Sequence, residues 1–353
     1  MARIASLSLA LVLLAAAVGS AQAPTRIDVA KLGPQIGDRI ATFTLKDQSG
    51  NSRTRDALMG PKGLMLVFSR SADWCPFCKT QLVELQGRLP ALQKQGLGLA
   101  VVTYDSPAIL ADFSRRRGIT FPLLSDVGSA TIKTFGLLNT TVDPASTNYG
   151  IPFPGTFIVN RQGVVTSRFF EEAYQERGTV ASMLLKLGQP GAEVDAERLG
   201  TPHVGITTYL SDAIVAPGTL FSIVADIAPK SGMHLYAPGQ HGYRVVTLKL
   251  NAPAFLKLRP VQYPASEIYV FKPLNERVEV YQKPFRLMQE AAFDASPEAR
   301  KALASMSAVT ISGTLEYQAC DDSTCFLSTS VPVSYAVQVR QLDTERAQVP
   351  KSP

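Results

Sequence analysis

The stretch LMLVFSRSADWCPFCK, residues 64–79, decides the fold of this chain. Its first six residues form a continuous apolar run, which predicts a strand buried on both faces. Two cysteines, Cys75 and Cys78, follow with two residues between them. Beyond them, leucines recur at helical spacing at positions 82, 85, 89 and 92. The sequence therefore predicts a buried strand, a turn that carries the cysteines, and a helix that begins at the cysteine motif.

This order of elements gives the two cysteines different chemical roles. Cys75 falls at the helix N-terminus, where unsatisfied backbone N–H groups and the helix dipole favour an anion. A thiolate there has a lowered pKa and is the form that attacks disulfides. Cys78, one turn further in, is expected to be better shielded and can attack Cys75 in a mixed disulfide to release the partner. Pro76 is tolerated because the first helical turn needs no internal N–H donor. We predict that Cys75 and Cys78 are the primary redox pair.

Strand and helix patterns alternate from residue 36 to residue 188. The expected elements are a leading hairpin that turns at 49–50, buried strands at 64–69 and 96–105, a short strand at 121–126, a hairpin that turns at 161–163, and helices near 108–117, 130–138 and 179–187. The next segment, 188–202, is polar, rich in Gly and Pro, and reads as a linker. Short alternating runs separated by Pro and Gly turns follow, with one helical segment at 296–304. They predict an all-β sandwich.

The first 23 residues have the pattern of a secretory signal peptide. Arg3 is their only charge, 7–18 is apolar, and small residues with an Ala-x-Ala pattern at Ala21 and Ala23 suggest cleavage there, or after Ala21. An uncleaved anchor is the alternative, although the apolar stretch is shorter than the ~20 residues of a spanning helix. We therefore expect export to the periplasm, where disulfides can form.

The chain has four cysteines, which fall into two close pairs, and the second pair is Cys320 with Cys325. A structural disulfide usually joins residues far apart in sequence, because closing a long loop constrains the unfolded chain more. Close pairs instead look like working dithiols. The adjacent Asp321 and Asp322 would disfavour a thiolate, so the second pair should be less acidic than Cys75. A plain structural disulfide remains an alternative for this pair.

Composition argues against several other functions. The formal net charge is +6, but the densest basic run, 115–117, stands alone, so no nucleic-acid surface is indicated. No phosphate-binding glycine loop or zinc-protease motif is present, and we expect neither a cofactor nor a metal. A zinc site built from both cysteine pairs would require two separate domains to meet.

Residues 34–188 resemble the thioredoxin superfamily, specifically its AhpC/TSA-like redoxin branch. The resemblance rests on G-D-x-x-x-x-F-x-L at 37–45, on the WCPFCK motif, and on Pro-Gly-Thr-Phe at 154–157. It implies an α/β thioredoxin fold and a cis proline against the active-site disulfide, at Pro154 or, as the competitor, Pro152. The substrate-binding residues that it implies are Trp74, Pro76, Phe77 and Pro154.

A peroxidase is the rival function within the same branch. Peroxiredoxins carry a proline seven residues, and a Thr or Ser three residues, before the peroxidatic cysteine. Counting back from Cys75 gives Phe68 and Ala72, and counting back from Cys78 gives Ser71 and Cys75. The hydroxyl that would hydrogen-bond a peroxide is missing for both cysteines, which favours dithiol exchange.

Residues 203–340 resemble the N-terminal periplasmic domain of the thiol:disulfide interchange protein DsbD. The matching features are Met-His-Leu-Tyr at 233–236 before a Pro-Gly turn, VQYPASEIYVF at 261–271, and the YQAC…C segment. The resemblance implies an immunoglobulin-like sandwich in which Cys320 and Cys325 relay electrons. This chain departs from the family in having four residues between the cysteines, in Leu235, and in lacking the membrane domain. His234, Tyr236 and Tyr317 are candidates for shaping the site, although such residues are more often simply packed.

The predicted organisation is a signal peptide at 1–23, a thioredoxin-like domain at 34–188, a linker at 189–202, a sandwich at 203–340 and a tail at 341–353. The predicted function is periplasmic thiol–disulfide exchange, with electrons passing between the two pairs across a flexible linker. The expected partners are periplasmic protein thiols or disulfides and a membrane electron donor of the DsbD or CcdA type. Besides the peroxidase, a non-catalytic adaptor for membrane redox or cytochrome-maturation partners is the alternative.

Overall fold

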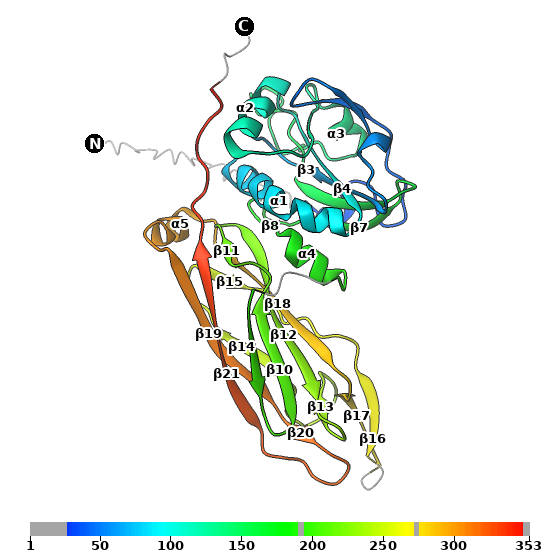
Figure 1. Cartoon of the computed structure of the whole chain (residues 1–353), viewed down its shortest axis with the longest axis vertical. Coiled ribbons are helices and arrows are strands. Elements are labelled where there is room, and N and C mark those ends of the chain that lie inside the picture. The colour runs from blue at the N-terminus through cyan, green and yellow to red at the C-terminus, as the bar shows by residue number, and fades with distance from the viewer. Residues whose placement is uncertain (1–26, 190–193, 272–274, 349–353) are drawn as a thin grey trace, which may run out of the picture.

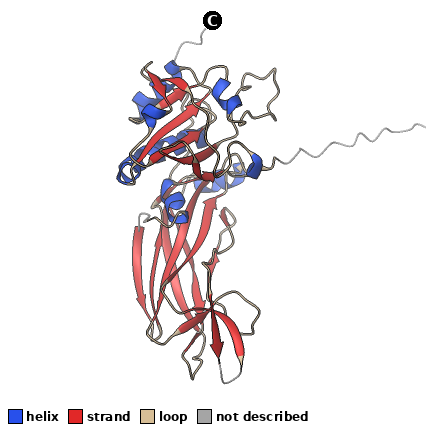
Figure 2. Cartoon of the chain, turned by 90° about the vertical axis from the view of Figure 1, so that its right-hand side faces the viewer, coloured by secondary structure: helices blue, strands red, loops and turns tan. Residues whose placement is uncertain are grey.

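The computed structural model describes residues 27–189, 194–271 and 275–348. The predicted signal peptide lies outside these ranges. Within them, no helix is long and apolar enough to cross a membrane. The molecule has two bodies stacked along its long axis, an α/β body and an elongated β body (Figure 1). Helices lie almost entirely in the first body, and strands form the second (Figure 2).

The first body is built on a seven-stranded sheet of order β2-β1-β5-β4-β3-β6-β7. Its strands are β1 (Thr44–Asp47), β2 (Ser52–Thr54), β3 (Gly63–Phe68), β4 (Leu97–Thr103), β5 (Leu123–Ser125), β6 (Gly155–Asn160) and β7 (Val165–Phe169). Its helices are η1 (Val29–Lys31), η2 (Asp56–Leu58), α1 (Pro76–Lys94), α2 (Pro107–Arg117), α3 (Ala130–Thr134) and α4 (Val180–Lys186). The central strands β3, β4 and β5 are parallel. Helices α1, α2 and α4 cover one face of the sheet and α3 covers the other.

Most of the expected elements of this body are present. All six residues of β3 are buried, as expected for a strand with cover on both faces. One helix is shorter than predicted, since α3 ends at Thr134 and not at residue 138. Gly136 has a φ of +65°, which ends the helical path. The chain then continues into an isolated bridge between Leu138 and Pro152.

The second body packs three sheets, of orders β15-β18-β12-β10-β9, β11-β21-β19-β14 and β16-β17-β13-β20. Its strands are β9 (Val194–Gly200), β10 (Val204–Leu210), β11 (Ile214–Val215), β12 (Thr219–Pro229), β13 (His234–Tyr236), β14 (Thr247–Asn251), β15 (Leu256–Leu258), β16 (Glu267–Phe271), β17 (Glu276–Tyr281), β18 (Phe285–Phe293), β19 (Ala308–Tyr317), β20 (Ala319–Cys320) and β21 (Thr329–Val339). One helix, α5 (Pro297–Leu303), interrupts them as predicted. The sandwich fold expected from the strand pattern is confirmed.

The segment predicted to be a linker is largely part of the sandwich. Its residues Val194–Gly200 form β9, which pairs antiparallel with β10, while 190–193 lie outside the described residues. The prediction of a flexible linker was wrong here because an edge strand exposed to solvent has a polar composition that resembles a loop.

The two bodies share backbone hydrogen bonds. The short strand β8 (Arg177–Gly178) of the first body pairs in parallel with β12 of the sandwich. Helix α4 follows β8 directly and contacts β12 as well. Beside this seam, Arg88 of α1 binds Asp212 at 2.7 Å. Because the junction is a paired strand with a helix behind it, the two bodies form a continuous structure.

Candidate active site at Cys75 and Cys78

The cysteine motif begins α1 as the sequence predicts. Cys75 is the N-cap residue of the helix, and Pro76 is its first residue. The backbone N–H of Cys78 donates to Cys75 Sγ over 3.2 Å. The two cysteines form a disulfide with their Cα atoms 5.2 Å apart. A sulfur that already accepts a helix N-terminal N–H is placed where a thiolate would be stabilised after reduction.

The disulfide is closed to solvent in this structure. Cys75 is 1% exposed and Cys78 is fully buried, so the expected difference in shielding between the two sulfurs is absent. They cluster with Phe77, with Ala295 of the sandwich, and with Leu342 of the C-terminal tail. Both the second body and the tail therefore contribute to covering this pair.

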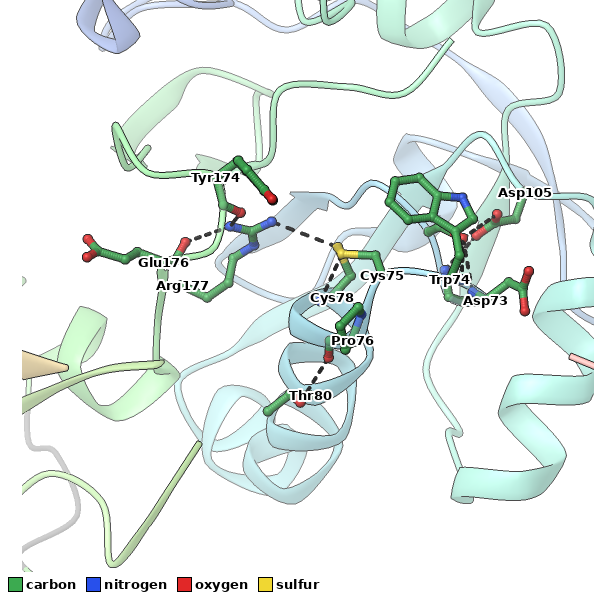
Figure 3. The surroundings of a disulfide bond; sticks show 12 residues. Asp73, Trp74, Cys75, Pro76, Cys78, Thr80, Asp105, Tyr174, Glu176 and Arg177 are labelled. Carbon is green, nitrogen blue, oxygen red and sulfur yellow. Dashed lines mark hydrogen bonds between the residues drawn. A yellow bond between two sulfur atoms is a disulfide. The ribbon is translucent and has the colours of Figure 1, made fainter. Parts of the chain in front are cut away.

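A buried arginine lies against the inner sulfur. Arg177 Nη2 is 3.8 Å from Cys78 Sγ, and its guanidinium also donates to the carbonyls of Tyr174 and Glu176 (Figure 3). Burial, together with the nearby Arg70 cation, lowers the pKa of the Arg177 guanidinium to about 9. A buried cation at this position would favour a thiolate on Cys78 in the reduced state. Sequence reasoning missed Arg177 because it reaches the site from β8, about 100 residues after the motif.

The loop before the motif is held by a buried carboxylate. Asp105 accepts hydrogen bonds from Ser71 Oγ at 2.8 Å and from the Ala72 N–H at 2.6 Å. Burial raises the pKa of Asp105 to about 6. The backbone that presents the cysteines is thereby fixed to the end of β4.

The four residues expected to bind substrate are placed differently from one another. Trp74 and Pro76 are partly exposed beside the disulfide. The Trp74 indole N–H donates to Tyr104 at 2.8 Å, and the Arg70 guanidinium lies 4.8 Å from the ring centre. Phe77 is buried against Gly218 of the sandwich, so its ring supports the junction between the bodies.

Pro154 does not have the expected conformation. All peptide bonds among the described residues are trans, so the cis bond predicted at Pro154, with Pro152 as competitor, is absent. The N–H of Phe153 donates to the Leu137 carbonyl at 2.7 Å, and this bond guides the chain into β6 without a cis peptide. Pro154 itself is buried just before β6, which pairs with the end of β3.

The second pair forms a disulfide at a strand end of the sandwich. Cys320 and Cys325 have Cα atoms 4.1 Å apart. Cys320 is buried on β20, whereas Cys325 is exposed. The Tyr236 hydroxyl lies 3.2 Å from Cys320 Sγ and 3.4 Å from Cys325 Sγ. A client thiolate could therefore reach Cys325 but not Cys320.

Aromatic side chains line a small pocket at this second disulfide. It is lined by His234, Tyr236, Tyr243, Tyr269 and Phe271, together with carboxylate and hydroxyl groups. The structure brings His234 and Tyr236 to the pair as expected. It does not bring Tyr317 there, because Tyr317 is in the sandwich core with its hydroxyl donating to Thr201.

The two cysteine pairs lie at opposite ends of the sandwich. Strand β19 follows α5, which lies at the end of the sandwich beside the first body, and runs to the far end, where β20 carries Cys320 (Figure 1). Its ten residues at ~3.3 Å each span about 30 Å. The structure does not bring the pairs together, so direct exchange within one chain has no geometric support.

Comparison with known proteins assigns both bodies to families. The model described as "AhpC/TSA family" matches residues 36–168, and the one described as "Thiol:disulfide interchange protein DsbD, N-terminal" matches 210–333. The Mycobacterium tuberculosis protein named alkyl hydroperoxide reductase E is 30% identical over 49% of this chain and 97% of its own length. The chain belongs to the AhpC/TSA family of redox proteins, in which it carries a DsbD N-terminal-type sandwich as a second domain.

Other relatives carry names from both redox classes. The Geobacillus thermodenitrificans protein named thiol-disulfide oxidoreductase ResA is 26% identical over 38% of this chain and 69% of that protein. Two solved structures are also similar: Peroxidoxin BcpB from Mycobacterium tuberculosis (22% identity, 40% of this chain, 89% of that chain, TM-score 0.36) and a thiol peroxidase from Chromobacterium violaceum (24%, 44%, 90%, TM-score 0.37). The names of the curated relatives therefore include both a peroxide reductase and a thiol-disulfide oxidoreductase.

Proposed function

We propose that this chain is a periplasmic thiol–disulfide oxidoreductase whose working pair is Cys75 and Cys78. The carrying observation is the disulfide at the start of α1, with a helix N–H on Cys75 Sγ and the Arg177 guanidinium at Cys78 Sγ. Both contacts favour thiolates, which are the reactive species in exchange. Export to the periplasm is part of the proposal and is supported by the signal-like pattern of 1–23.

The reduction of a client follows from this arrangement. The Cys75 thiolate attacks one sulfur of the client disulfide, and the other client sulfur leaves with the electron pair as a thiolate. The Cys78 thiolate then attacks Cys75 Sγ in the mixed disulfide and releases the second client sulfur. Two electrons have passed to the client, and the two protons of the dithiol end on the client thiols. The chain is left with the Cys75–Cys78 disulfide seen in the structure, and client oxidation is the reverse sequence.

Peroxide reduction has less support from the residues. Ala72 stands three residues before Cys75, and its backbone N–H is used by Asp105. Phe68, seven residues before Cys75, is the last residue of β3. Neither offers a hydroxyl to a peroxide, although the names of several relatives include that activity.

We assign the second pair to exchange with a separate protein. Cys325 is exposed in a pocket of aromatic groups, and Cys320 is the buried partner that would resolve the intermediate. A membrane electron donor of the DsbD or CcdA type fits this role. Supply of electrons from there to Cys75 and Cys78 would require contact between different molecules, since the pairs lie at opposite ends of the sandwich.

A trapping experiment tests the assignment of the first pair. A Cys78→Ala variant cannot resolve the mixed disulfide and should accumulate covalent client adducts through Cys75 in periplasmic extract. A Cys75→Ala variant is the matched control and should trap far less. Absence of adducts, together with peroxide consumption that depends on Cys75, would establish the peroxidase instead. Client binding that survives replacement of both cysteines by Ser would favour the adaptor.

A further inference from the structure

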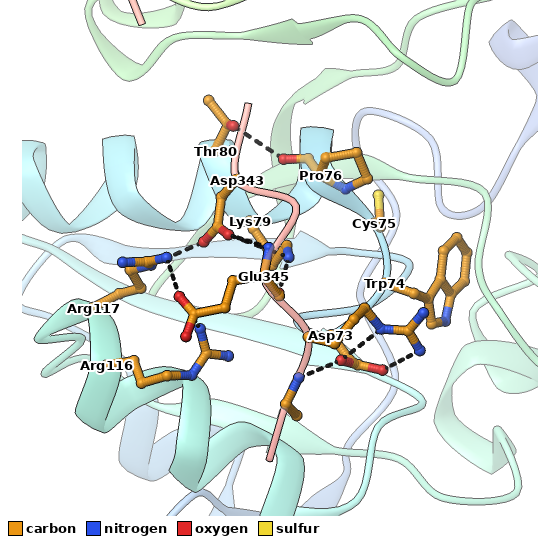
Figure 4. Close-up of polar contacts among 12 residues, drawn as sticks. Asp73, Trp74, Cys75, Pro76, Lys79, Thr80, Arg116, Arg117, Asp343 and Glu345 are labelled. Atoms are coloured by element: carbon orange, nitrogen blue, oxygen red, sulfur yellow. Dashed lines mark hydrogen bonds and ion pairs between the residues drawn. The ribbon is translucent and has the colours of Figure 1, made fainter. Parts of the chain in front are cut away.

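The C-terminal tail, residues 341–348, returns to the first body beside its disulfide (Figure 4). It leaves β21 at the junction of the two bodies and has no helix or strand of its own. A polar tail surrounded only by solvent is not expected to adopt a single conformation. The contacts that fix it are therefore informative about the surface beneath it.

Leu342 makes the apolar part of this contact. Its side chain packs against the cluster of Cys75, Phe77 and Cys78. A leucine laid over an active-site disulfide removes the open approach that an attacking thiolate needs. Together with Ala295 of the sandwich, Leu342 contributes to the near-zero exposure of Cys75 and Cys78.

Acidic residues of the tail meet basic residues of α1 and α2. Asp343 lies 3.4 Å from Lys79 Nζ and 2.8 Å from Arg117 Nε. Lys79 is one residue after Cys78, and its side chain is only 1% exposed. Glu345 pairs with Arg116 at 3.1 Å and with Arg117 at 2.7 Å. The Lys79 ammonium also donates to the Glu345 carbonyl, so it binds the main chain of the tail.

In one further ion pair the charges are reversed, with the cation on the tail and the carboxylate on the first body. Arg346 donates to both carboxylate oxygens of Asp73, at 2.9 and 2.6 Å. The N–H of Ala347 donates to the same carboxylate at 2.6 Å. Asp73 is two residues before Cys75, so the tail is bound on both sides of the motif.

We propose that this face of the first body, formed by Asp73, Lys79, Arg116 and Arg117, binds an extended client segment, and that the tail occupies it as a competing internal ligand. The proposal rests on the proposed oxidoreductase function and names its client class. The preferred segment presents an apolar side chain at the disulfide, followed by acidic residues that meet the basic groups of α1 and α2.

Release of the tail opens the pair to chemistry. A client thiolate can then attack Cys75 Sγ, and Cys78 Sγ leaves with the bonding electron pair as a thiolate beside Arg177. A second client thiolate attacks the client sulfur of this mixed disulfide and expels Cys75 as a thiolate. The client gains a disulfide, and its two electrons remain on the reduced pair. While the tail is bound, the first of these attacks is blocked.

The rate of reduction of the first disulfide tests the tail directly. Trp74 is the only tryptophan of the chain and adjoins Cys75, so its fluorescence reports this pair in the full-length protein. Reduced glutathione should react about tenfold faster with D343N/E345Q than with the original chain, because several partly exposed ion pairs are lost together. Glutathione should also reduce the first disulfide faster in a Leu342→Ala variant. This single variant serves as the test if the double variant does not fold.

Glu316→Gln is the matched control. Glu316 also pairs with two cations, Arg244 and Lys249, but lies on β19 of the sandwich. Glutathione should reduce the first disulfide of the Glu316→Gln variant at the same rate as that of the original chain. An added peptide QLDTERAQ should slow reduction of D343N/E345Q again, whereas QLNTQRAQ should not. Equal rates in all folded variants, or equal effects of the two peptides, would overturn the proposal.

The same variants separate the two proposals. If D343N/E345Q and the original chain reduce protein disulfides at equal rates, the tail proposal fails and the oxidoreductase assignment stands. If glutathione reduces the first pair faster in the variant, but neither chain forms client adducts through Cys75 when it also carries Cys78→Ala, the tail still covers the disulfide, whereas the oxidoreductase assignment and the client class that rests on it both fail.

Discussion

The two disulfides of this chain are alike in sequence spacing but differ in their structural setting and in their access to solvent. The first begins a helix, and both its sulfurs are buried beneath side chains from another body and from the tail. The second closes a turn after β20 and leaves Cys325 exposed. The spacing of the cysteines suggests two similar working dithiols. Their surroundings show instead that both cysteines of the first pair are buried, whereas Cys325 of the second pair is open to solvent.

The charges around the pairs differ in the same way. Arg177 places a buried cation at the first disulfide, and the partly buried Arg70 lies over the neighbouring Trp74 ring. The second has Asp321 and Asp322 beside it, and backbone N–H groups of the turn hold the pKa of Asp321 below its usual value. Cations favour thiolates and anions oppose them, so the first pair should be the more acidic when reduced.

Among the variants that distinguish the two pairs, removal of the nucleophile Cys75 should have the largest effect on the rate of client reduction. With a chemical reductant supplied, Cys75→Ser should lower the rate of client disulfide reduction by about 10³-fold or more, because no other thiolate sits at the helix start. Cys325→Ser should leave that rate within about twofold. Steady-state reduction of insulin measures both. A large loss in the Cys325 variant would reverse the roles given to the two pairs.

Replacing Arg177 should reduce the difference in thiol acidity between the two pairs. Arg177→Gln is expected to raise the apparent thiol pKa of the reduced first pair by about one to two units, because a cation near Cys78 is lost. Thiolate absorbance against pH measures the shift, and Arg177→Lys should restore part of it. Arg277→Gln, an exposed arginine of the sandwich, is the control. An unchanged titration in the Gln variant would mean that Arg177 only supports the fold.

The junction beneath the first disulfide should make stability depend on pH. Burial and the nearby Asp212 carboxylate raise the pKa of Glu84 on α1 from 4.5 to about 8. The folded state then keeps a proton that the unfolded state releases, so stability falls as pH rises from about 4.5 to about 8. Glu84→Gln should remove at least about 1 kcal/mol of this fall.

Urea unfolding at pH 5.5 and pH 8.5 measures that effect. Glu298→Gln on α5, an exposed position, serves as the control and should keep the pH dependence of the original chain. If Glu84→Gln lost stability between the two pH values as steeply as the original chain, the buried carboxyl would not be its source.

The smallest effect is expected at the second pair. Tyr236→Phe removes a hydroxyl that contacts both sulfurs and costs about 1 kcal/mol, which shifts the reduction potential by about 20 mV. Glutathione titration with alkylation and mass analysis of each pair measures it. The first pair should not move. A shift of equal size in both pairs would show that they are coupled through the sandwich.

The sequence predicted those parts of the site that depend on local order. The apolar run of β3, the N-cap at Cys75 and the helix after it all follow from neighbours in the chain, as does the hairpin of β6 and β7. The positions of Arg177 and Leu342 could not be predicted in this way. Each reaches the disulfide through the packing of one body on the other, and their local sequences contain no motif. Strand β9 was missed because its polar residues read equally well as a loop.

The pairing of β8 with β12 also affects how separable the halves are. The Arg177 N–H donates to the Gly218 carbonyl at 2.8 Å, so the sandwich holds the backbone of the residue that contacts Cys78. A gene fragment ending at Gly188 would encode both cysteines and the arginine, yet leave that arginine on an unpaired edge. The thiol pKa values and reduction potential of such a fragment should therefore differ from those of the full-length chain. For the same reason, the two halves are not independent modules. A recombination event that joined the first body to a different sandwich would also change the thiol pKa of Cys75 and Cys78.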